Sequence, residues 1–273
     1  MKDYFTYNVS STIPDTAFRI SPSQLSRFLD STSQWYREML LDEAPAFTGS
    51  TASYLGTCVH ACAAMHFDNG FIDHTAIYAY INSIKDAEVD KAVIRQQYPI
   101  MADVLVRDFL SKTKGTHSEL FVSTAIAPNV YAAGSIDLYD EKRATVYDYK
   151  TMGSLDSARV PTTFPRSYYF QQLCYSYILR KNGHKVDYCK LIYVSRDNTG
   201  RMSEKTGKPL TDYPSTVSVV THQITDEDMQ IIENTLKLIA DSVILWNSNP
   251  ELRYILMQDY RLKLPPPRTL FKD

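Results

Sequence analysis

The sequence has little net charge and no long apolar run. Its 273 residues carry 29 basic and 31 acidic side chains, a formal net charge of −2 at pH 7, so no overall positive field marks it as a nucleic-acid-binding protein. No apolar run is long enough to cross a membrane, and the opening residues MKDYFTYNVS do not resemble a signal peptide. We therefore expect no membrane association and a cytoplasmic location.

Cysteine is also scarce. The four cysteines, Cys58, Cys62, Cys174 and Cys189, form no CxxC pair, and no short disulfide framework is expected. The sequence also lacks a GxxxxGK[ST] loop, so nothing supports a phosphoryl-transfer enzyme that uses nucleotides.

Hydrophobic residues make up 44% of the chain and charged residues 22%, an ordinary globular composition. Without repeats or a convincing linker, residues 1–273 are predicted to form one domain of the α/β (α+β) class. Its expected parts are a helical part over 20–112, a sheet core over 116–224 that contains a helix over 167–182, a C-terminal helix over 225–247 and a tail over 248–273.

Start and stop signals refine this outline. Residues 1–20 read as an irregular lead-in, and Ser21 followed by proline predicts the N-cap of one helix that runs to about Leu41. Pro99 is expected to break the next helical region, residues 74–112, into two segments. Thr225 is expected to cap the C-terminal helix because three acidic residues follow it.

The stretch from Ala133 to Thr151 is the most informative, because two alternating segments flank a polar turn and predict a β-hairpin. A turn centred between Lys142 and Arg143 places Asp137 opposite Asp148, and Lys150 shares the face of Asp148. Opposed carboxylates repel each other unless a cation lies between them. An ordinary solvated sheet face is the alternative interpretation of the same alternation.

Other polar residues occur where the pattern is otherwise apolar. His60 lies in the apolar helix predicted over 53–67, one turn after Gly56, where a glycine allows a close approach. Gln171 and Tyr175 are an i, i+4 pair on the helix over 167–182, and Glu119 begins a predicted strand. The alternative interpretations are a packed core histidine and an aromatic core stripe with a buried glutamine.

Taken in order, these residues resemble the motifs of the RecB-like branch of the PD-(D/E)XK nuclease superfamily, which includes phage exonucleases of the exonuclease VIII and lambda exonuclease types. The matching motifs are GxxxH at Gly56–His60, the strand Glu119, GxxD at Gly134–Asp137, DYKT at Asp148–Thr151 and QxxxY at Gln171–Tyr175. The resemblance implies a restriction-endonuclease-like core, with a central mixed sheet, a metal-binding hairpin, and added N- and C-terminal helices.

The resemblance also implies roles for these residues. The implied metal ligands are His60, Glu119, Asp137, Asp148 and the carbonyl of Tyr149. The implied catalytic group is Glu119, Asp137, Asp148, Lys150, Gln171 and Tyr175, in which Lys150 orients or deprotonates the attacking water and stabilises the phosphate. One or two Mg²⁺ or Mn²⁺ ions would activate water and offset the phosphate charge, with the histidine favouring Mn²⁺ somewhat.

The implied activity is a metal-dependent DNA exonuclease of phage-type recombination or end processing, acting in the host cytoplasm if a phage encodes it. Its partners would be DNA and a single-strand annealing or recombination protein, and an oligomer is compatible with the resemblance. The alternatives are an endonuclease or single-strand-specific nuclease on the same core, and a catalytically silent DNA-binding or interaction protein. Some relatives hold an iron–sulfur cluster with C-terminal cysteines; no cysteine follows Cys189, so we expect no cluster.

The residues that would contact DNA phosphates are less clear from the sequence. Arg159, Arg166 and the polar loop over 195–212, with basic residues from Arg196 to Lys208, are candidates by position. A solvated hairpin tip is the alternative interpretation of this loop.

Overall fold

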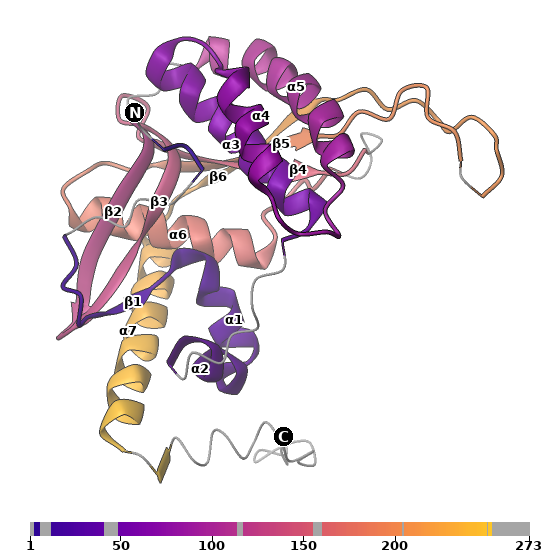
Figure 1. Ribbon diagram of the computed structural model, residues 1–273. Helices are drawn as coiled ribbons and strands as arrows, with labels where there is room; N and C mark the ends of the chain where they lie inside the picture. Colours follow the sequence, from indigo (N-terminus) through magenta and orange to yellow (C-terminus); the bar gives the residue numbers. More distant parts are fainter. Residues whose placement is uncertain are drawn as a thin grey trace, which may run out of the picture.

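The computed structural model describes residues 3–5, 12–40, 49–113, 117–154, 160–203, 205–249 and 251–252. A mixed sheet of six strands lies at the centre, with helices on both of its faces (Figure 1). This arrangement confirms the expected α/β class with a central mixed sheet and helices added at both ends of the chain.

The elements follow one another in an order close to the predicted one. The strands are β1 (Phe18–Ile20), β2 (His117–Ala127), β3 (Val130–Asp140), β4 (Thr145–Met152), β5 (Tyr188–Ser195) and β6 (Val217–Gln223). The helices are α1 (Leu25–Asp30), α2 (Thr32–Leu40), α3 (Thr51–Asn69), α4 (His74–Ser83), α5 (Lys91–Asp108), α6 (Arg166–Lys181) and α7 (Asp226–Ser248), with short 3-10 turns η1 (Pro22–Gln24) and η2 (Leu110–Lys112).

Strand β3 organises the sheet because it pairs with three others. It is antiparallel to β2 along one edge; along the other it is parallel to β1 at its start and antiparallel to β4 at its end. The sheet then continues through β5, parallel to β4, and β6, antiparallel to β5. The β3–β4 pairs run from Asp140–Thr145 to Leu138–Tyr147, so the hairpin register is the predicted one, and the ladder stops one pair before Asp137 and Asp148.

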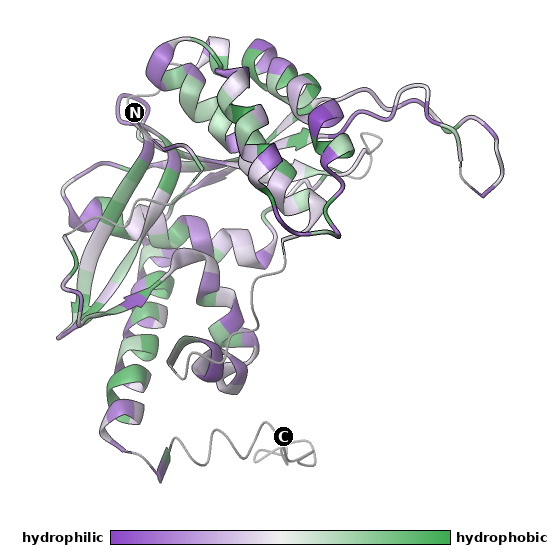
Figure 2. Cartoon of the chain, in the orientation of Figure 1, coloured by the Kyte–Doolittle hydropathy of each residue, from purple (hydrophilic) through white to green (hydrophobic). Residues whose placement is uncertain are grey.

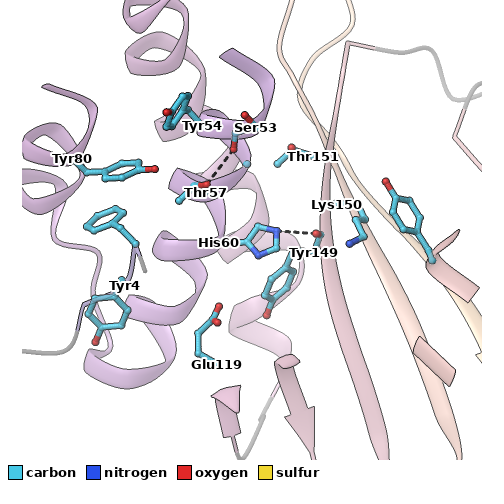
Figure 3. Close-up of a pocket in the computed structure, with 13 residues that line it drawn as sticks. Tyr4, Ser53, Tyr54, Thr57, His60, Tyr80, Glu119, Tyr149, Lys150 and Thr151 are labelled. Atoms are coloured by element: carbon cyan, nitrogen blue, oxygen red, sulfur yellow. Dashed lines mark hydrogen bonds between the residues drawn. The ribbon is translucent and has the colours of Figure 1, made fainter. Parts of the chain in front are cut away.

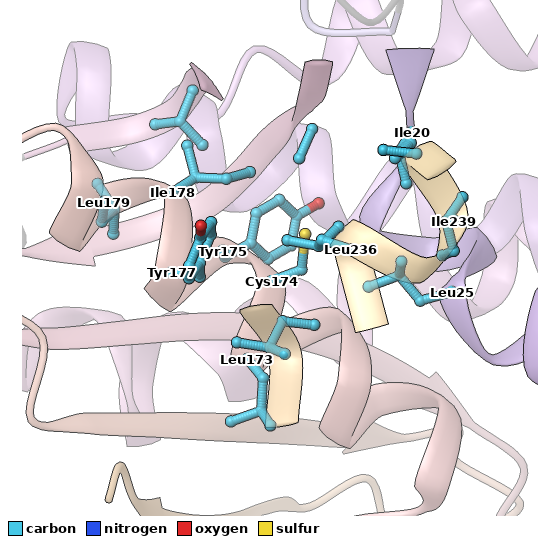
Figure 4. Close-up of a cluster of buried hydrophobic side chains, with 14 of the residues drawn as sticks. Ile20, Leu25, Leu173, Cys174, Tyr175, Tyr177, Ile178, Leu179, Leu236 and Ile239 are labelled. Atoms are coloured by element: carbon cyan, nitrogen blue, oxygen red, sulfur yellow. The ribbon is translucent and has the colours of Figure 1, made fainter. Parts of the chain in front are cut away.

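The two largest hydrophobic cores of the described residues form on the two faces of the sheet. Helices α3, α4 and α5 cover one face, where Tyr147 and Tyr149 of β4 point, whereas Val146 points into the core under α6, α7 and α1. The second core includes Leu173 of α6 and Leu236 of α7 (Figure 4). Helices α3 and α5 carry hydrophobic and hydrophilic residues side by side, so each presents an apolar side to the sheet (Figure 2).

The N-terminal region differs from the prediction in two ways. The lead-in over 1–20 contains strand β1, whose Phe18 N–H donates to the carbonyl of Asn129 at 2.7 Å; three residues are too few for a periodic signal. The single helix predicted from Ser21 is instead η1, α1 and α2, with Ser31 in a non-helical conformation between the last two. Ser21 is the N-cap of η1 but makes no side-chain capping hydrogen bond, and Leu41 lies outside the described residues.

The prediction of a break at Pro99 is wrong, because α5 runs through it from Lys91 to Asp108. A proline removes one helical hydrogen bond, and here the burial of Tyr98 and Met101 on either side of it stabilises the helix. The interruption occurs earlier, between α4 and α5.

The C-terminal part matches its prediction more closely. Thr225 caps α7 through a capping box with Asp228, while the expected tail lies outside the described residues beyond Leu252. Between β5 and β6 the chain projects away from the sheet as an arm (Figure 1, orange), which we define as residues 196–215. An isolated bridge between Met202 and Pro209 joins its two sides. Within the described residues no helix is long and apolar enough to cross a membrane.

Candidate active site

The site begins where β3 and β4 separate. Beyond the Leu138–Tyr147 pair, β3 no longer pairs with β4, and the backbone N–H of Tyr149 donates instead to Asp137 Oδ2 at 2.7 Å. The carbonyl of Tyr149 accepts from His60 Nε2 at 2.9 Å (Figure 3). Side chains thus satisfy both backbone groups that the separating strands leave open, and this holds Asp137 and His60 at one point.

Helix α3 brings His60 to this point because Gly56 permits a close approach to β4. A Cβ at Gly56 would lie 3.3 Å from Thr151 Oγ1, tighter than an ordinary van der Waals contact. Gly134 has a similar role on β3, since a Cβ there would lie 3.0 Å from Pro22 Cδ and 3.1 Å from Tyr175 Cε1. The glycines of the two sequence motifs therefore allow α3, η1 and α6 to close around the separated strands.

Glu119 reaches the site from β2 with an unusual backbone. Its φ angle is +51°, and it is left out of the β2–β3 ladder opposite Asp137, although the Ser118–Leu138 and Leu120–Ile136 pairs on either side keep the same register. A non-glycine residue in this region costs about 1–3 kcal/mol, and such strain clusters at functional sites. One ligand atom each of His60, Glu119 and Asp137 lie within 4.8 Å of one another.

A second group lies between β4 and α6. Lys150 Nζ is 2.6 Å from Asp148 Oδ2 and 3.4 Å from Gln171 Oε1, and Gln171 Nε2 donates to Asp148 Oδ1 at 3.3 Å. The ring of Tyr168, one turn before Gln171, lies 4.5 Å from Lys150 Nζ. The half-buried Gln171 therefore bridges the lysine and the carboxylate.

The two carboxylates have opposite electrostatic environments. Burial raises the pKa of Asp148 to about 6; the charge of Lys150 lowers it in part and that of Asp137 raises it further. Burial also acts to raise the pKa of Asp137, but the charge and hydrogen bond of His60 outweigh it, and the pKa is lowered.

The two cationic side chains of the site, His60 and Lys150, both have raised pKa values. Burial disfavours a charged imidazole, but Asp137 overcomes it and raises the pKa of His60 to about 9. Burial likewise disfavours the ammonium of Lys150, yet Asp148 and Asp137 raise its pKa. Burial, with the charges of Asp137 and Asp148, raises the pKa of Tyr175 well above its usual range, so its hydroxyl stays neutral.

The donor set suits a divalent cation. Carboxylates of Asp137 and Glu119, the imidazole of His60 and the carbonyl of Tyr149 combine the oxygen and nitrogen ligands that bind such ions. Asp148 approaches the same point from β4 but is paired with Lys150. The structure thus brings together all eight sequence-predicted residues, while their individual roles stay predictions.

A pocket of about 590 Å³ opens over these groups. On one side it is lined by aromatic residues that the sequence analysis did not single out: Tyr4, Phe5, Tyr54 and Tyr80 (Figure 3). The available signal was weak, because the six-residue spacing between Tyr54 and His60 does not place them on one face of α3, and the other rings come from distant segments.

The candidate DNA contacts lie apart from this pocket's lining. Arg166, at the start of α6, is exposed and forms an ion pair with Asp30. Arg201, Lys205 and Lys208 are exposed on the arm. Arg159 lies outside the described residues.

The geometry is that of a candidate metal-dependent enzyme. Acidic residues and a histidine that could hold an ion lie beside a lysine, on a hairpin of a mixed sheet. A family model described as the PD-(D/E)XK nuclease superfamily matches residues 19–244, so the chain belongs to that superfamily and is a DNA nuclease. Nucleases of this superfamily use divalent metal ions, and the residues present here fit one.

Solved structures share the fold at low sequence identity. A protein from Eubacterium rectale described as a candidate exonuclease is 12% identical, with a TM-score of 0.53 over 83% of this chain and 80% of that chain. An alkaline exonuclease from Laribacter hongkongensis is 9% identical, with a TM-score of 0.34 over 76% of this chain and 97% of that chain. No curated protein matches. The expected restriction-endonuclease-like core is therefore confirmed by the family match and the first of these structures.

Proposed function

We propose that this protein is a metal-dependent DNA exonuclease that processes DNA ends, with phage-type recombination as its setting. The observation that carries the proposal is the convergence of two aspartates with Glu119, His60 and Lys150, the last three of which line the pocket. The exonuclease part is supported by the Eubacterium rectale protein that shares the fold. The setting, and a single-strand annealing or recombination partner, are supported by the resemblance to phage exonucleases.

The proposed ligands are His60, Glu119, Asp137, Asp148 and the carbonyl of Tyr149, with Mg²⁺ or Mn²⁺ as the ion. When bound, such an ion supplies an activated water and offsets the negative charge of the phosphate. Hard oxygen donors suit both ions, and the imidazole of His60 favours Mn²⁺ somewhat.

Lys150 and its neighbours would act directly on the phosphate. The raised pKa of Lys150 keeps its ammonium charged at neutral pH, so it donates hydrogen bonds to a phosphate oxygen rather than accepting a proton from water. Gln171 contacts both Lys150 and Asp148 and fixes their separation. The neutral hydroxyl of Tyr175 forms a hydrogen bond with the side chain of Gln171 and so helps to fix its position.

The first experiment compares linear and closed circular double-stranded DNA, each with Mg²⁺, with Mn²⁺ and with EDTA. We expect metal-dependent loss of linear DNA only, and no loss with the Asp148→Asn protein. Cleavage of closed circles would replace the proposal with an endonuclease. DNA binding without cleavage of any form, in both metals, would instead indicate a catalytically silent protein.

The arm is the proposed contact with DNA beyond the pocket, because it projects from the sheet and exposes Arg201, Lys205 and Lys208. For duplex DNA, each phosphate that a basic side chain neutralises adds roughly 0.9 to the steepness with which log affinity falls against log salt. Replacing the three residues by glutamine should therefore weaken binding and flatten that slope. Replacing exposed Lys237 of α7 provides the control, and an unchanged slope in the triple variant would contradict the assignment.

A further inference from the structure

We propose that the aromatic side of the pocket is a stacking site for an unpaired terminal nucleobase. We define this aromatic wall as Phe5, Tyr54 and Tyr80. The inference rests on the proposed nuclease function and names the form of substrate that the same pocket takes: a DNA end whose last base has left the duplex.

The wall consists of rings that already stack on one another. The rings of Phe5 and Tyr80 are nearly parallel, with centroids 4.3 Å apart and planes 10° apart. The ring of Tyr54 lies 6.3 Å from Tyr80 at 54°. All three are partly buried against the core beneath α3 and α4 and also line the pocket, so each is held by packing while part of its surface faces the pocket (Figure 3).

Tyr54 of the wall lies beside Ser53 at the start of α3, and His60 of the metal-ligand group lies about two turns further along the same helix. Ser53, Thr57 and His60 follow one another along α3 and all line the pocket. Seven residues of α-helix span roughly 10 Å, so a chain that places its phosphate at His60 and Lys150 can extend its sugar and base towards the wall. Neighbouring bases of a duplex are stacked only about 3.4 Å apart. A base that extends roughly 10 Å along α3 to the wall has therefore left that stack.

The polar groups between the two ends favour stacking over reading of base identity. The hydroxyl of Ser53 donates to the carbonyl of Ser50 at 2.8 Å, and that of Thr57 donates to the carbonyl of Ser53 at 3.2 Å. Their protons are therefore engaged with the helix backbone. Stacking on aromatic rings tolerates every base because each has a π face, so this site selects an unpaired base of any identity.

The test removes the base from the DNA and the ring from the protein. Single-stranded oligonucleotides carry either a normal or an abasic residue at the 5′ end or at the 3′ end, and kcat/KM is measured for the wild type, Tyr54→Leu and Tyr80→Leu. We expect the wild type to lose about tenfold or more on one abasic end. On normal DNA, kcat/KM of each leucine variant should be lower than that of the wild type by a similar factor. Replacing the normal end by the abasic end should then lower the kcat/KM of that variant little further.

Two kinds of control separate the ring from the fold. Tyr54→Phe and Tyr80→Phe keep the rings and should keep the wild-type preference for a normal end. Tyr78→Leu changes an exposed tyrosine of the same helix α4, outside the pocket lining, and should behave as the wild type. An abasic penalty that persists undiminished in both leucine variants, or that is missing from the wild type at both ends, would overturn the stacking site.

A binding measurement keeps this result separate from the nuclease activity. In EDTA, a terminal 2-aminopurine should lose fluorescence when wild-type protein binds the oligonucleotide, and lose much less with Tyr80→Leu. If the wild type cleaves no DNA, the proposed function fails, and this quenching still decides for or against the stacking site. Equal quenching by the wild type and Tyr80→Leu would refute it.

Discussion

Asp228 and Asp148 are both buried carboxylates beside a histidine or lysine, yet their pKa values shift in opposite directions. Burial acts to raise the pKa of Asp228, but hydrogen bonds from the Tyr169 hydroxyl, Thr225 and His222 outweigh it and lower the pKa. Its partners include the Thr225 N–H at 2.8 Å and His222 Nε2 at 2.9 Å. Asp148, with Lys150 as its cationic partner, retains a raised pKa of about 6.

The difference separates a carboxylate whose charge the fold stabilises from one whose charge the fold disfavours. Fixed donors surround Asp228 at the start of α7, so its charge is stabilised by the fold itself. The negative charge of Asp137 instead disfavours the charged form of Asp148, and the neighbouring strained Glu119 adds a third carboxylate. Such a group gains from a bound cation, whereas Asp228 would not.

The largest expected effect is on cleavage by Asp148→Asn. We expect the initial rate on linear DNA to fall about 10²- to 10⁴-fold, because the variant loses charge at the reacting centre, while the melting temperature in EDTA does not fall. The exposed Asp241→Asn on α7 is the matched control and should cleave normally. A large drop in melting temperature would show that Asp148, like Asp228, is mainly structural.

Metal binding should stabilise the folded protein through the group of His60, Glu119 and Asp137, and not through the cluster around Asp228. At a metal concentration about 100 times Kd, Mg²⁺ or Mn²⁺ should add about 2.7 kcal/mol to the free energy of unfolding. Asp137→Asn should lose most of that gain, and Asp228→Asn should keep it. Thermal unfolding with and without metal measures both, and an equal gain in wild type and Asp137→Asn would place the ion elsewhere.

Asp228→Asn should lower stability and leave catalysis intact. The variant loses charged hydrogen bonds and part of the capping box, a loss of about 2 kcal/mol in the free energy of unfolding. Urea denaturation at pH 7 measures the loss, and kcat for linear DNA should stay within about twofold, because the hydrogen-bond partners of Asp228 are not site residues. A fall in kcat comparable to that of Asp148→Asn would contradict the separation of the two clusters.

The stabilising effect of Asp228 should disappear in acid. Its pKa is lower in the folded protein than in the unfolded chain, so its contribution is present above the unfolded value of about 4 and is lost as the pH falls through the lowered folded value. The stability difference between wild type and Asp228→Asn should therefore shrink as the pH falls below about 4. A constant difference would mean that charge is not its cause.

The smallest expected effect concerns Tyr168, whose ring contacts the ammonium of Lys150. A cation–π contact of about 0.5–1 kcal/mol predicts a two- to fivefold loss of kcat in Tyr168→Leu, with Tyr168→Phe close to wild type. A similar loss in both variants would assign the effect to the hydroxyl instead of the ring.

The hairpin could be predicted because strand alternation and a polar turn fix which residues oppose each other. The register that faces Asp137 with Asp148 was correct, but the separation of the strands beyond it was not foreseen, since it depends on side chains from other elements. Pro99 misled the prediction because local propensity ignores the burial of neighbouring residues.

The sequence by itself determined the α/β class, the hairpin and the ordered set of polar residues from His60 to Tyr175, because periodicity and turn chemistry are local properties. Only the tertiary structure decided that Tyr149 offers its backbone to Asp137 and His60, that Glu119 is strained, and that an aromatic wall lies beside them. These features join segments far apart in the chain, and their formation depends on how the two cores pack against the sheet.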